Sequence, residues 1–399
     1  MGNGLKLGRI AGIDIIADWS LLIIFVLVLV SLGAGLIPAW HPDWSAALIW
    51  GTALAAAVIL FASVLVHELS HAVVGRARGM EIRRIVLFVF GGMAQFEREP
   101  HAWRAELWMA AVGPITSLVL GIAMLLAAST GLDPEVYEAV DPREALEGLG
   151  AVTTLLLWAG QVNILLALFN LVPGFPLDGG RVLRAILWGV TGDLVRATRW
   201  ASTMGQMFAW FLIGMGVAMM LGVRVPVFGT GLVSGLWLAF IGWFLNNAAL
   251  LSYRQILIKE TLEDVPVGRV MLTDVVSVDA ATSVDRFVDE YLMRRDQRAY
   301  PVLENGRLAG LVCFSDVRGV DRDTWSERTV ADIMTPAERL TRLAPSDDAS
   351  EALSVLGRGG INQLPVVENG EVRGLVRRED ILKWLSLHGD DDLSPIARV

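Results

Sequence analysis

Six long apolar stretches, separated by short polar segments, dominate the first 250 residues of the chain. The shortest holds 19 residues, which is enough for a helix to cross the hydrocarbon core of a bilayer. The pattern therefore predicts six transmembrane helices, at residues 20–38, 46–74, 105–129, 152–171, 203–222 and 227–245. The composition agrees, because 54% of the residues are hydrophobic and the mean hydropathy is +0.53.

Two shorter segments have the residue types of strands. Residues 85–96 are too short to span as a helix, are rich in β-formers, and are interrupted by Gly91 and Gly92. We expect a short strand or hairpin that dips into the protein and either lines a cavity or is buried by helices, because exposed strand edges cannot face lipid. Its free edge could pair with an extended peptide; an amphipathic connector is the alternative. Residues 10–16 form either a strand or an interfacial segment.

The distribution of charge predicts the orientation. Residues 75–104 hold six arginines and residues 174–202 hold four, whereas the alternate loops hold at most one each. The arginine-rich side is the expected cytoplasmic side, which places both termini in the cytoplasm of a multi-pass cell-membrane protein. The formal net charge of −9 belongs entirely to residues 260–399, which argues against nucleic-acid binding. Cys313 is the single cysteine, so no internal disulfide can form.

The second apolar stretch ends in His-Glu-Leu-Ser-His, with His67, Glu68 and His71. Two histidines four residues apart share one face of a helix and can bind one metal ion, with the glutamate placed to act as general base. An HExxH string also arises by chance in soluble helices. Three ionisable groups at the end of a membrane helix are costly, however, so we favour an intramembrane metalloprotease site.

A third metal ligand is expected elsewhere, because catalytic zinc takes three protein ligands and keeps one position open. Residues 170–180 read Asn-Leu-Val-Pro-Gly-Phe-Pro-Leu-Asp-Gly-Gly and offer Asp178 at the cytoplasmic end of the fourth helix. Pro173 and Pro176 break the helix there. A Pro/Gly-rich loop with an aspartate is often only a turn, but its position on the same side of the membrane as HELSH favours a ligand.

The paired motifs resemble those of the site-2 protease family of intramembrane zinc metalloproteases, over residues 1–250. The resemblance implies one zinc ion per chain, with His67, His71 and Asp178 as ligands and Glu68 as catalytic acid/base. It also implies that Asn170 is an active-site hydrogen-bond donor and that the Gly91-Gly92 segment is a re-entrant β-element that presents substrate. Residues 130–150 are too short for the PDZ domain that many bacterial relatives carry, so the chain resembles the compact branch.

Residues 260–399 contain an internal repeat with an offset of 63–64 residues. The segment Tyr-Pro-Val-Leu-Glu-Asn-Gly at 300–306 matches Leu-Pro-Val-Val-Glu-Asn-Gly at 364–370. Each copy has the pattern helix, strand, hairpin turn, strand, helix, which resembles a tandem pair of cytosolic α/β CBS domains. The expected parts are a linker at 251–264, CBS domains at 265–322 and 323–388, and a tail at 389–399.

The CBS resemblance implies an adenine nucleotide such as ATP or AMP, with a hydroxyl residue at the phosphate and an aspartate at the ribose. Asp316 and Asp380 occupy the aspartate positions, but Cys313 and Arg377 stand where Ser or Thr is expected. Arg377 could still contact a phosphate as a charge-assisted donor. The alternative is a pair that is purely structural or that forms a homodimer.

The sequence thus predicts a polytopic α-helical membrane domain with six transmembrane helices, a re-entrant β-element and a cytosolic tandem CBS domain. The expected activity is zinc endopeptidase cleavage of a transmembrane segment of a membrane-protein substrate near the cytoplasmic face, in regulated intramembrane proteolysis. A CBS-regulated transporter or channel with a metal site is the alternative, and an inactive scaffold is a third. A conduction path predicts intramembrane charges in the later helices, and their central runs contain none.

Overall fold

The computed structural model describes residues 4–80, 82–89, 91–96, 100–131, 146–225, 229–359 and 361–388. The chain divides into two compact units, Met1–Tyr253 and Arg254–Val399. The first is the membrane unit and the second is the CBS unit. The predicted tail at 389–399 lies outside the described residues.

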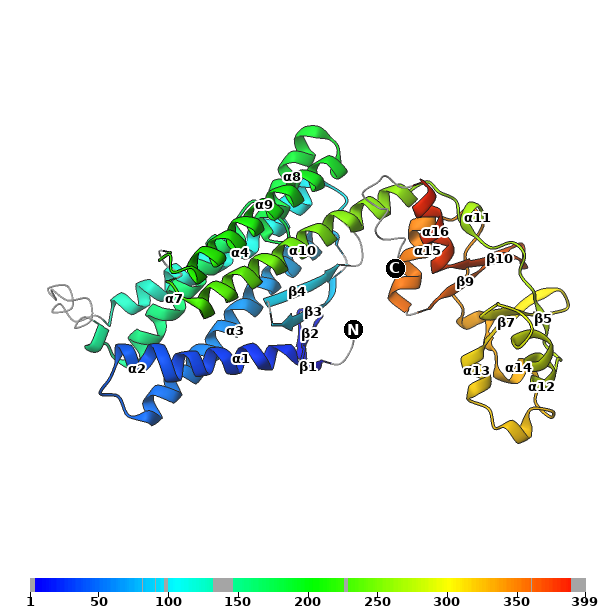
Figure 1. Cartoon of the computed structure of the whole chain (residues 1–399), viewed down its shortest axis with the longest axis horizontal. Helices are drawn as coiled ribbons and strands as arrows, with labels where there is room; N and C mark the ends of the chain where they lie inside the picture. Colours follow the sequence, from blue (N-terminus) through cyan, green and yellow to red (C-terminus); the bar gives the residue numbers. More distant parts are fainter. Residues whose placement is uncertain are drawn as a thin grey trace. The chain divides into compact units, whose positions relative to one another are not determined.

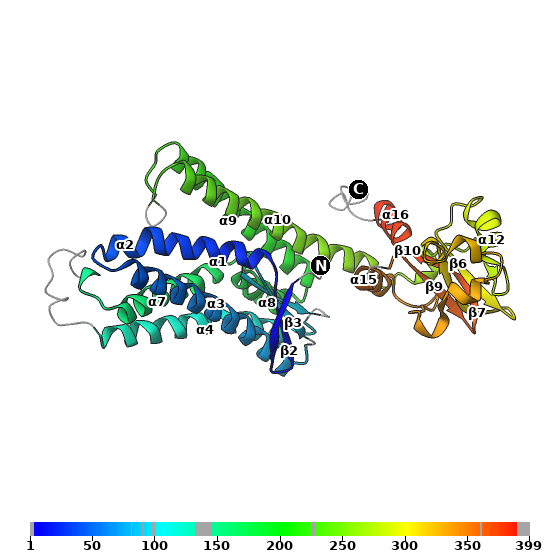
Figure 2. The same ribbon diagram turned by 90° about the horizontal axis from the view of Figure 1, so that it is seen from below.

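The membrane unit contains the six predicted apolar helices, each long enough to cross a bilayer. The first combines α1, a π-helical turn at Leu32–Leu36, and α2. Helices α3, α4 and α7 pack against one another, and α1 packs on α3 (Figures 1 and 2). The bounds are α1 Ser20–Ser31, α2 Ile37–Trp40, α3 Ala46–Ala77, α4 Trp103–Ser129, α7 Ala151–Asn170, α9 Leu194–Met220 and α10 Leu232–Leu262.

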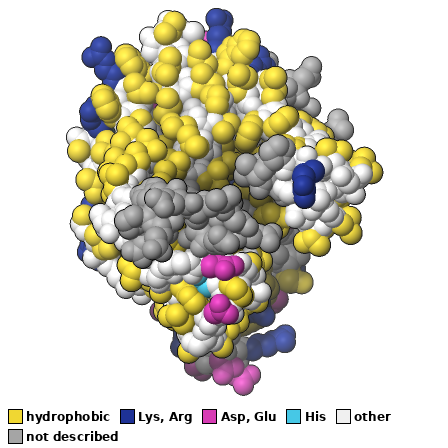
Figure 3. All heavy atoms as spheres, turned by 90° about the vertical axis from the view of Figure 1, so that its left-hand side faces the viewer, with side chains coloured by type: hydrophobic (Ala, Val, Ile, Leu, Met, Phe, Trp, Pro, Cys, Tyr) yellow, Lys and Arg dark blue, Asp and Glu magenta, His cyan; other side chains and the backbone are white. Residues whose placement is uncertain are grey.

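The outer surface of these helices is apolar, as a bilayer requires. Leu22, Ile23 and Val26 on α1 are exposed, and so are Trp210 and Phe211 on α9. At the end of the membrane unit away from the sheet, hydrophobic side chains predominate and charged ones are scattered (Figure 3). Exposed apolar side chains in this number need lipid around them, which agrees with the six predicted spans.

Three features of the helices differ from the sequence expectation. Residues 178–191 form a separate short helix, α8 (Asp178–Thr191). It escaped the hydropathy pattern because Arg181 and Arg184 interrupt its apolar residues. Helix α9 begins at Leu194, nine residues early, with the Asp193 side chain accepting a hydrogen bond from the Arg196 N–H as an N-cap. Helix α10 continues to Leu262, through most of the segment expected as a linker.

A four-stranded sheet joins two distant parts of the membrane unit. Its order is β1-β2-β3-β4, with β2 and β3 parallel and the other pairs antiparallel. Ile13, Ile15 and Ile85 are fully or almost fully buried and pack with Ala72 of α3 and Met109 of α4. The predicted hairpin is confirmed, and the segment around residue 13 is a strand. The bounds are β1 Leu5–Ile10, β2 Ile13–Ala17, β3 Ile82–Phe88 and β4 Gly91–Phe96.

The CBS unit contains the predicted two copies of an α/β repeat. Both central hairpins turn at Asn-Gly pairs with positive φ, at Asn305-Gly306 and Asn369-Gly370, as type I′ turns require. The first copy comprises α11 Val267–Val270, β5 Val278–Asp279, α12 Val284–Phe287, a π-helical turn Val288–Leu292, β6 Ala299–Glu304, β7 Arg307–Cys313 and α13 Phe314–Arg318. The second comprises α14 Val330–Ile333, β8 Thr335–Pro336, α15 Ala349–Gly359, β9 Gln363–Glu368, β10 Glu371–Arg377 and α16 Arg378–His388, with short 3-10 turns at Arg322–Thr324 and Ala337–Arg339.

The two repeats complete each other's sheets. Thr335 and Pro336 at the start of the second copy pair with β7 of the first. Leu272 near the start of the first copy pairs with Leu375 on β10 of the second. This exchange explains why the repeat occurs as a pair, because each copy alone would leave a strand edge unpaired.

Candidate metal centre

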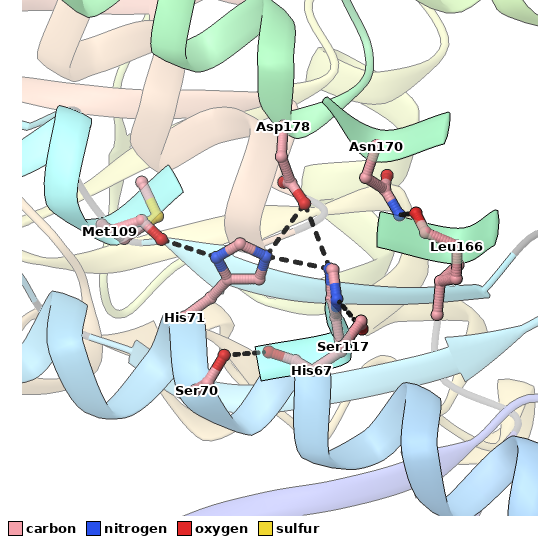
Figure 4. A network of polar contacts seen from close by, with 8 residues as sticks. All are labelled: His67, Ser70, His71, Met109, Ser117, Leu166, Asn170 and Asp178. Atoms are coloured by element: carbon pink, nitrogen blue, oxygen red, sulfur yellow. Dashed lines mark hydrogen bonds and ion pairs between the residues drawn. The ribbon is translucent and has the colours of Figure 1, made fainter. Parts of the chain in front are cut away.

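The HELSH motif lies on α3, about two turns before the helix ends at Ala77. His67 and His71 leave the same face of the helix because they are four residues apart. Their Nε2 atoms are 3.2 Å apart, and both residues are buried. The structure therefore brings the two predicted histidines together at one point (Figure 4).

Asp178 reaches this point from the first turn of α8. One of its carboxylate oxygens, Oδ2, lies 3.1 Å from His67 Nε2 and 3.2 Å from His71 Nε2. Figure 4 shows the carboxylate pointing at both imidazoles from the facing helix. Asp178, more than 100 positions from both histidines in sequence, is thus in direct contact with them.

A tight turn between α7 and α8 makes this approach feasible. Proline at 173 and 176 interrupts the helix because it lacks an N–H. The following glycines allow close backbone packing: a Cβ on Gly179 would lie 2.4 Å from the carbonyl carbon of Leu171, and one on Gly180 would lie 2.3 Å from that of Gly174. Glycine is therefore required at both positions directly after the aspartate.

Helix α4 holds the outer nitrogen of each imidazole. His71 Nδ1 lies 2.6 Å from the carbonyl oxygen of Met109, and His67 Nδ1 lies 2.9 Å from Ser117 Oγ (Figure 4). A carbonyl only accepts, so His71 Nδ1 carries the hydrogen and Nε2 of the neutral ring presents a lone pair. The Ser117 hydroxyl can accept from His67 in the same way. Such outer contacts orient metal-binding histidines.

The three inner atoms fit a zinc ion. His67 Nε2, His71 Nε2 and Asp178 Oδ2 form a triangle with edges of 3.1–3.2 Å. Tetrahedral zinc with bonds of about 2.0 Å separates its ligand atoms by about 3.3 Å. Two imidazole nitrogens and a carboxylate oxygen are also a donor set of catalytic zinc sites. Lone pairs that face one another at this distance repel, and a cation at their centre would remove that repulsion.

Asp178 is the most exposed member of the triad. The side chains of His67 and His71 are 5% and 6% exposed, whereas that of Asp178 is 18% exposed. Water can therefore reach the carboxylate more readily than the imidazoles.

Glu68 lies beside the triad and contacts the sheet. Its side chain packs against Gly92 of β4, where an added Cβ would lie 2.2 Å from Glu68 Cγ and 3.0 Å from Oε1. Gly91 is the preceding residue of the same strand, with φ +125°, and has open space at its Cβ position. Of the two predicted substrate-guiding glycines, Gly92 is thus the one that contacts the predicted catalytic glutamate.

A buried ion pair ties α8 to α4 close to the centre. The Arg184 guanidinium donates to a Glu106 carboxylate oxygen, and the two residues are 4% and 0% exposed. Arg184 also lies over the Phe175 ring, 5.2 Å from its centroid. The pair joins the helix that carries Asp178 to the helix that orients both histidines.

Among the described hydrogen bonds, none joins Asn170 to the triad. Its amide nitrogen donates to the Leu166 carbonyl, 3.0 Å away in the same helix (Figure 4). Sequence reasoning missed the outer contacts of Met109 and Ser117 and the pair of Glu106 with Arg184. Ser117, Glu106 and Arg184 could have been noticed as polar or charged residues in or beside an apolar helix. The contact of Met109 is made by its backbone carbonyl, which has no sequence signal.

The candidate nucleotide residues lie in the CBS unit, and local bonds already occupy them. Asp316 Oδ2 accepts the backbone N–H and the thiol of Cys313, at 2.8 and 3.0 Å. Arg377 donates two hydrogen bonds of 2.7 Å to Asp380, and these bonds raise the pKa of Arg377. Both aspartates are half-buried at the start of a helix that follows a strand.

These features define a multi-pass membrane protein with an HExxH-type metal site and a tandem CBS unit. Sequence comparison gives the family. The model of peptidase family M50 matches residues 55–148 and 135–213, and the CBS domain model matches residues 267–323 and 330–387.

Relatives match over almost the whole chain. Rip3 of Mycobacterium tuberculosis is 33% identical over 393 residues, 97% of this chain and 94% of Rip3. The Synechocystis protein sll0528 is 31% identical over 389 residues, 96% of each chain. Both are assigned to the zinc metalloproteases. The solved site-2 protease from Methanocaldococcus jannaschii is 25% identical, with a TM-score of 0.41, over 63% of this chain and 95% of its own.

The chain therefore belongs to peptidase family M50 and carries two CBS domains. It is a membrane metallopeptidase of the site-2 type, as the paired motifs predicted.

Proposed function

We propose that this protein is a zinc endopeptidase that cleaves a transmembrane segment of a membrane-protein substrate. The convergence of His67, His71 and Asp178 beside Glu68, inside a bundle of membrane helices, carries the proposal. The triad would hold one zinc ion, which supplies Lewis acidity to water and to the scissile carbonyl.

In this proposal Glu68 transfers the proton. Its carboxylate accepts a proton from the attacking water as the water oxygen bonds to the carbonyl carbon. It then returns the proton to the nitrogen as the carbon–nitrogen bond breaks. The outer contacts of the histidines with Met109 and Ser117 keep both Nε2 atoms directed at the metal position.

We propose further that the substrate adds a strand to β4. Among the described residues, β4 pairs only with β3, so its other edge is available. Neighbouring strands lie about 4.8 Å apart, so a substrate strand beside Gly92 would pass close to Glu68, which contacts that glycine. A helix must unwind to pair in this way, which favours substrates with glycine or proline in the membrane segment.

The proposed orientation places both termini and the metal centre on the cytoplasmic side. The arginine-rich segments at 75–104 and 174–202 flank the ends of α3 and α8 that carry the site. Cleavage there would release a fragment of the substrate to the cytoplasm, as regulated intramembrane proteolysis requires. Fusing reporters to each terminus and testing their accessibility in sealed cells would test this orientation.

Glu68→Gln separates chemistry from metal binding. Because Glu68 is outside the triad, the variant should keep one zinc per chain but lose cleavage of a reporter membrane segment. Mass spectrometry of membrane proteins from cells with wild-type or variant enzyme would then identify substrates. Cleavage that survives Glu68→Gln would contradict the mechanism. Absence of cleavage by the wild-type enzyme on every membrane segment tested would favour the transporter alternative.

Regulation by an adenine nucleotide at the CBS pair is a separate proposal. The family match and the equivalent positions of Asp316 and Asp380 support it. A ribose would have to replace the bonds that Cys313 and Arg377 make to these carboxylates. Calorimetric titration of the whole protein with ATP and with AMP tests it, with Asp316→Ala/Asp380→Ala as the control.

A homodimer through this unit is also proposed, and light scattering with and without nucleotide would measure it.

A further inference from the structure

A glycine of α4 lies directly over the two histidines. A Cβ added to Gly113 would lie 2.2 Å from His71 Nε2, 2.4 Å from His71 Cε1 and 2.8 Å from His67 Nε2. Side-chain carbons do not approach other heavy atoms this closely, so any residue other than glycine would displace an imidazole. The atoms displaced would include both nitrogens that face Asp178.

Other glycines in the bundle have different neighbours. A Cβ on Gly121, two turns further along α4, would meet Ile164 and the Gly160 carbonyl of α7. A Cβ on Gly160 would meet Leu125 of α4. These glycines let two helices pack closely, as small residues do in membranes. Gly113 differs because its nearest neighbours are metal-ligand atoms of α3.

Gly92 makes the corresponding contact on the opposite side of the motif. A Cβ added to Gly92 would lie 2.2 Å from Glu68 Cγ and 2.7 Å from Glu68 Cδ, so it would overlap that side chain. Gly91, its neighbour on β4, has open space at the same position. The close approach is therefore specific to the residue that touches Glu68, and is not a property of the whole strand.

We infer that Gly113 and Gly92 are positioning residues with separate tasks: Gly113 reserves the volume in which the metal is held, and Gly92 sets the position of the Glu68 carboxylate. The task of Gly113 concerns metal binding alone. The task of Gly92 rests on the proposed function. Substituting alanine at each position should therefore disable the enzyme in two distinguishable ways.

The experiment compares Gly113→Ala, Gly92→Ala and the control Gly121→Ala in the full chain. Zinc content and competition with a chelator are measured, together with the visible spectrum after Co²⁺ replacement and cleavage of a reporter segment. We expect Gly113→Ala to weaken zinc binding by at least about 10-fold, the lower end of the effect of disturbing ligand orientation. Gly121→Ala should bind zinc as the wild type does.

Gly92→Ala should keep wild-type zinc affinity and the same Co²⁺ spectrum but lower kcat by at least about 100-fold, because the general acid/base is moved. Zinc affinity in Gly113→Ala equal to the wild type would overturn the role of Gly113. Unchanged kcat in Gly92→Ala would overturn the role of Gly92. If no variant and no wild-type sample cleaves any reporter, the proposed function fails while the metal measurements still decide the role of Gly113.

A folding defect in Gly113→Ala is resolved by a double variant. Gly113→Ala/His71→Ala removes the imidazole that the new methyl group would overlap most, and Gly113→Ala/His67→Ala/His71→Ala removes both imidazoles. If the single variant does not fold, the double variant should fold, with the tryptophan fluorescence and thermal transition of His71→Ala alone. If Gly113→Ala/His67→Ala/His71→Ala fails to fold while His67→Ala/His71→Ala folds, position 113 clashes with the helix packing and not with the histidines, which contradicts the inference.

Discussion

Asp178 in the membrane unit contacts residues more than 100 positions away, whereas Asp380 in the CBS unit bonds to Arg377 only three positions away. Asp178 therefore depends on the whole fold for its place, and its neighbours are two imidazole nitrogens with which it can bind one cation. The carboxylates of Asp316 and Asp380 already receive donors from their own segments. A metal ion would complete the site at Asp178. A nucleotide would have to compete with the existing hydrogen bonds of Asp316 and Asp380.

The largest effect should follow from removing Asp178. Asp178→Ala deletes one of three ligands, so zinc affinity should fall by more than the 10–100-fold typical of losing an outer contact. Chelator competition measures the affinity, and reporter cleavage should be undetectable. Asp380→Ala is the matched change in the CBS unit and should leave zinc binding unchanged. If Asp178→Ala keeps wild-type zinc affinity, Asp178 is not a zinc ligand.

The second largest effect should follow from breaking the ion pair between α4 and α8. Arg184→Met leaves the fully buried Glu106 carboxylate without its main partner, and losing one member of a buried pair typically costs 3–5 kcal/mol. Glu106→Gln/Arg184→Met should be less destabilised than Arg184→Met alone. Unfolding in mixed detergent micelles measures both. Arg196→Met, at an exposed pair with Asp193, is the control and should change stability by less than about 1 kcal/mol.

A smaller effect is expected from the outer contact of His67. Ser117→Ala removes the acceptor of the Nδ1 hydrogen without touching the ligand atoms, so zinc affinity should fall by about 10-fold. Ser117→Thr keeps the hydroxyl and should restore most of the affinity. Equal affinities for the alanine and threonine variants would show that this hydrogen bond does not orient His67.

The smallest effect is a pH dependence in the CBS unit. The backbone N–H and the hydroxyl of Thr329 hold the pKa of Asp332 below its usual value. A lowered folded-state pKa stabilises the fold above the unfolded pKa of about 3.9, and this contribution is lost as the pH falls. The melting-temperature difference between wild type and Asp332→Asn should therefore shrink from pH 6 towards pH 3. A difference that stays constant over this range would exclude the effect.

The sequence predicted the parts of the site that have a regular spacing or a costly composition. His67 and His71 could be recognised because they are four residues apart on one predicted helix. Asp178 could be recognised because it is a charged residue in a helix-breaking segment. Helix α8 was missed because Arg181 and Arg184 interrupt its apolar residues and lower the hydropathy of the segment. The Met109 carbonyl has no sequence signal at all. Gly113 could be noticed only as a glycine before a proline, because its contact with the imidazoles depends on how α4 crosses α3.

The CBS unit was more predictable than the sheet of the membrane unit. Repeated Asn-Gly turns between short apolar segments indicate hairpins locally, and both were found. By contrast, the parallel pairing of β2 with β3 joins segments on either side of two membrane helices. No local pattern encodes such a pairing.

This parallel pairing also sets an order for biosynthesis. The β1–β2 hairpin leaves the ribosome first, but its partner β3 follows only after α1 and α3 have been made. At about 5–20 residues per second, the hairpin waits roughly 3–13 s with its strand edge unpaired. During that time two spans must enter the membrane so that β2 and β3 end on the same side. The sheet that touches Glu68 can therefore form only after both of the first two spans have been inserted, because a chain in which only one of them crosses leaves β2 and β3 on opposite sides of the membrane.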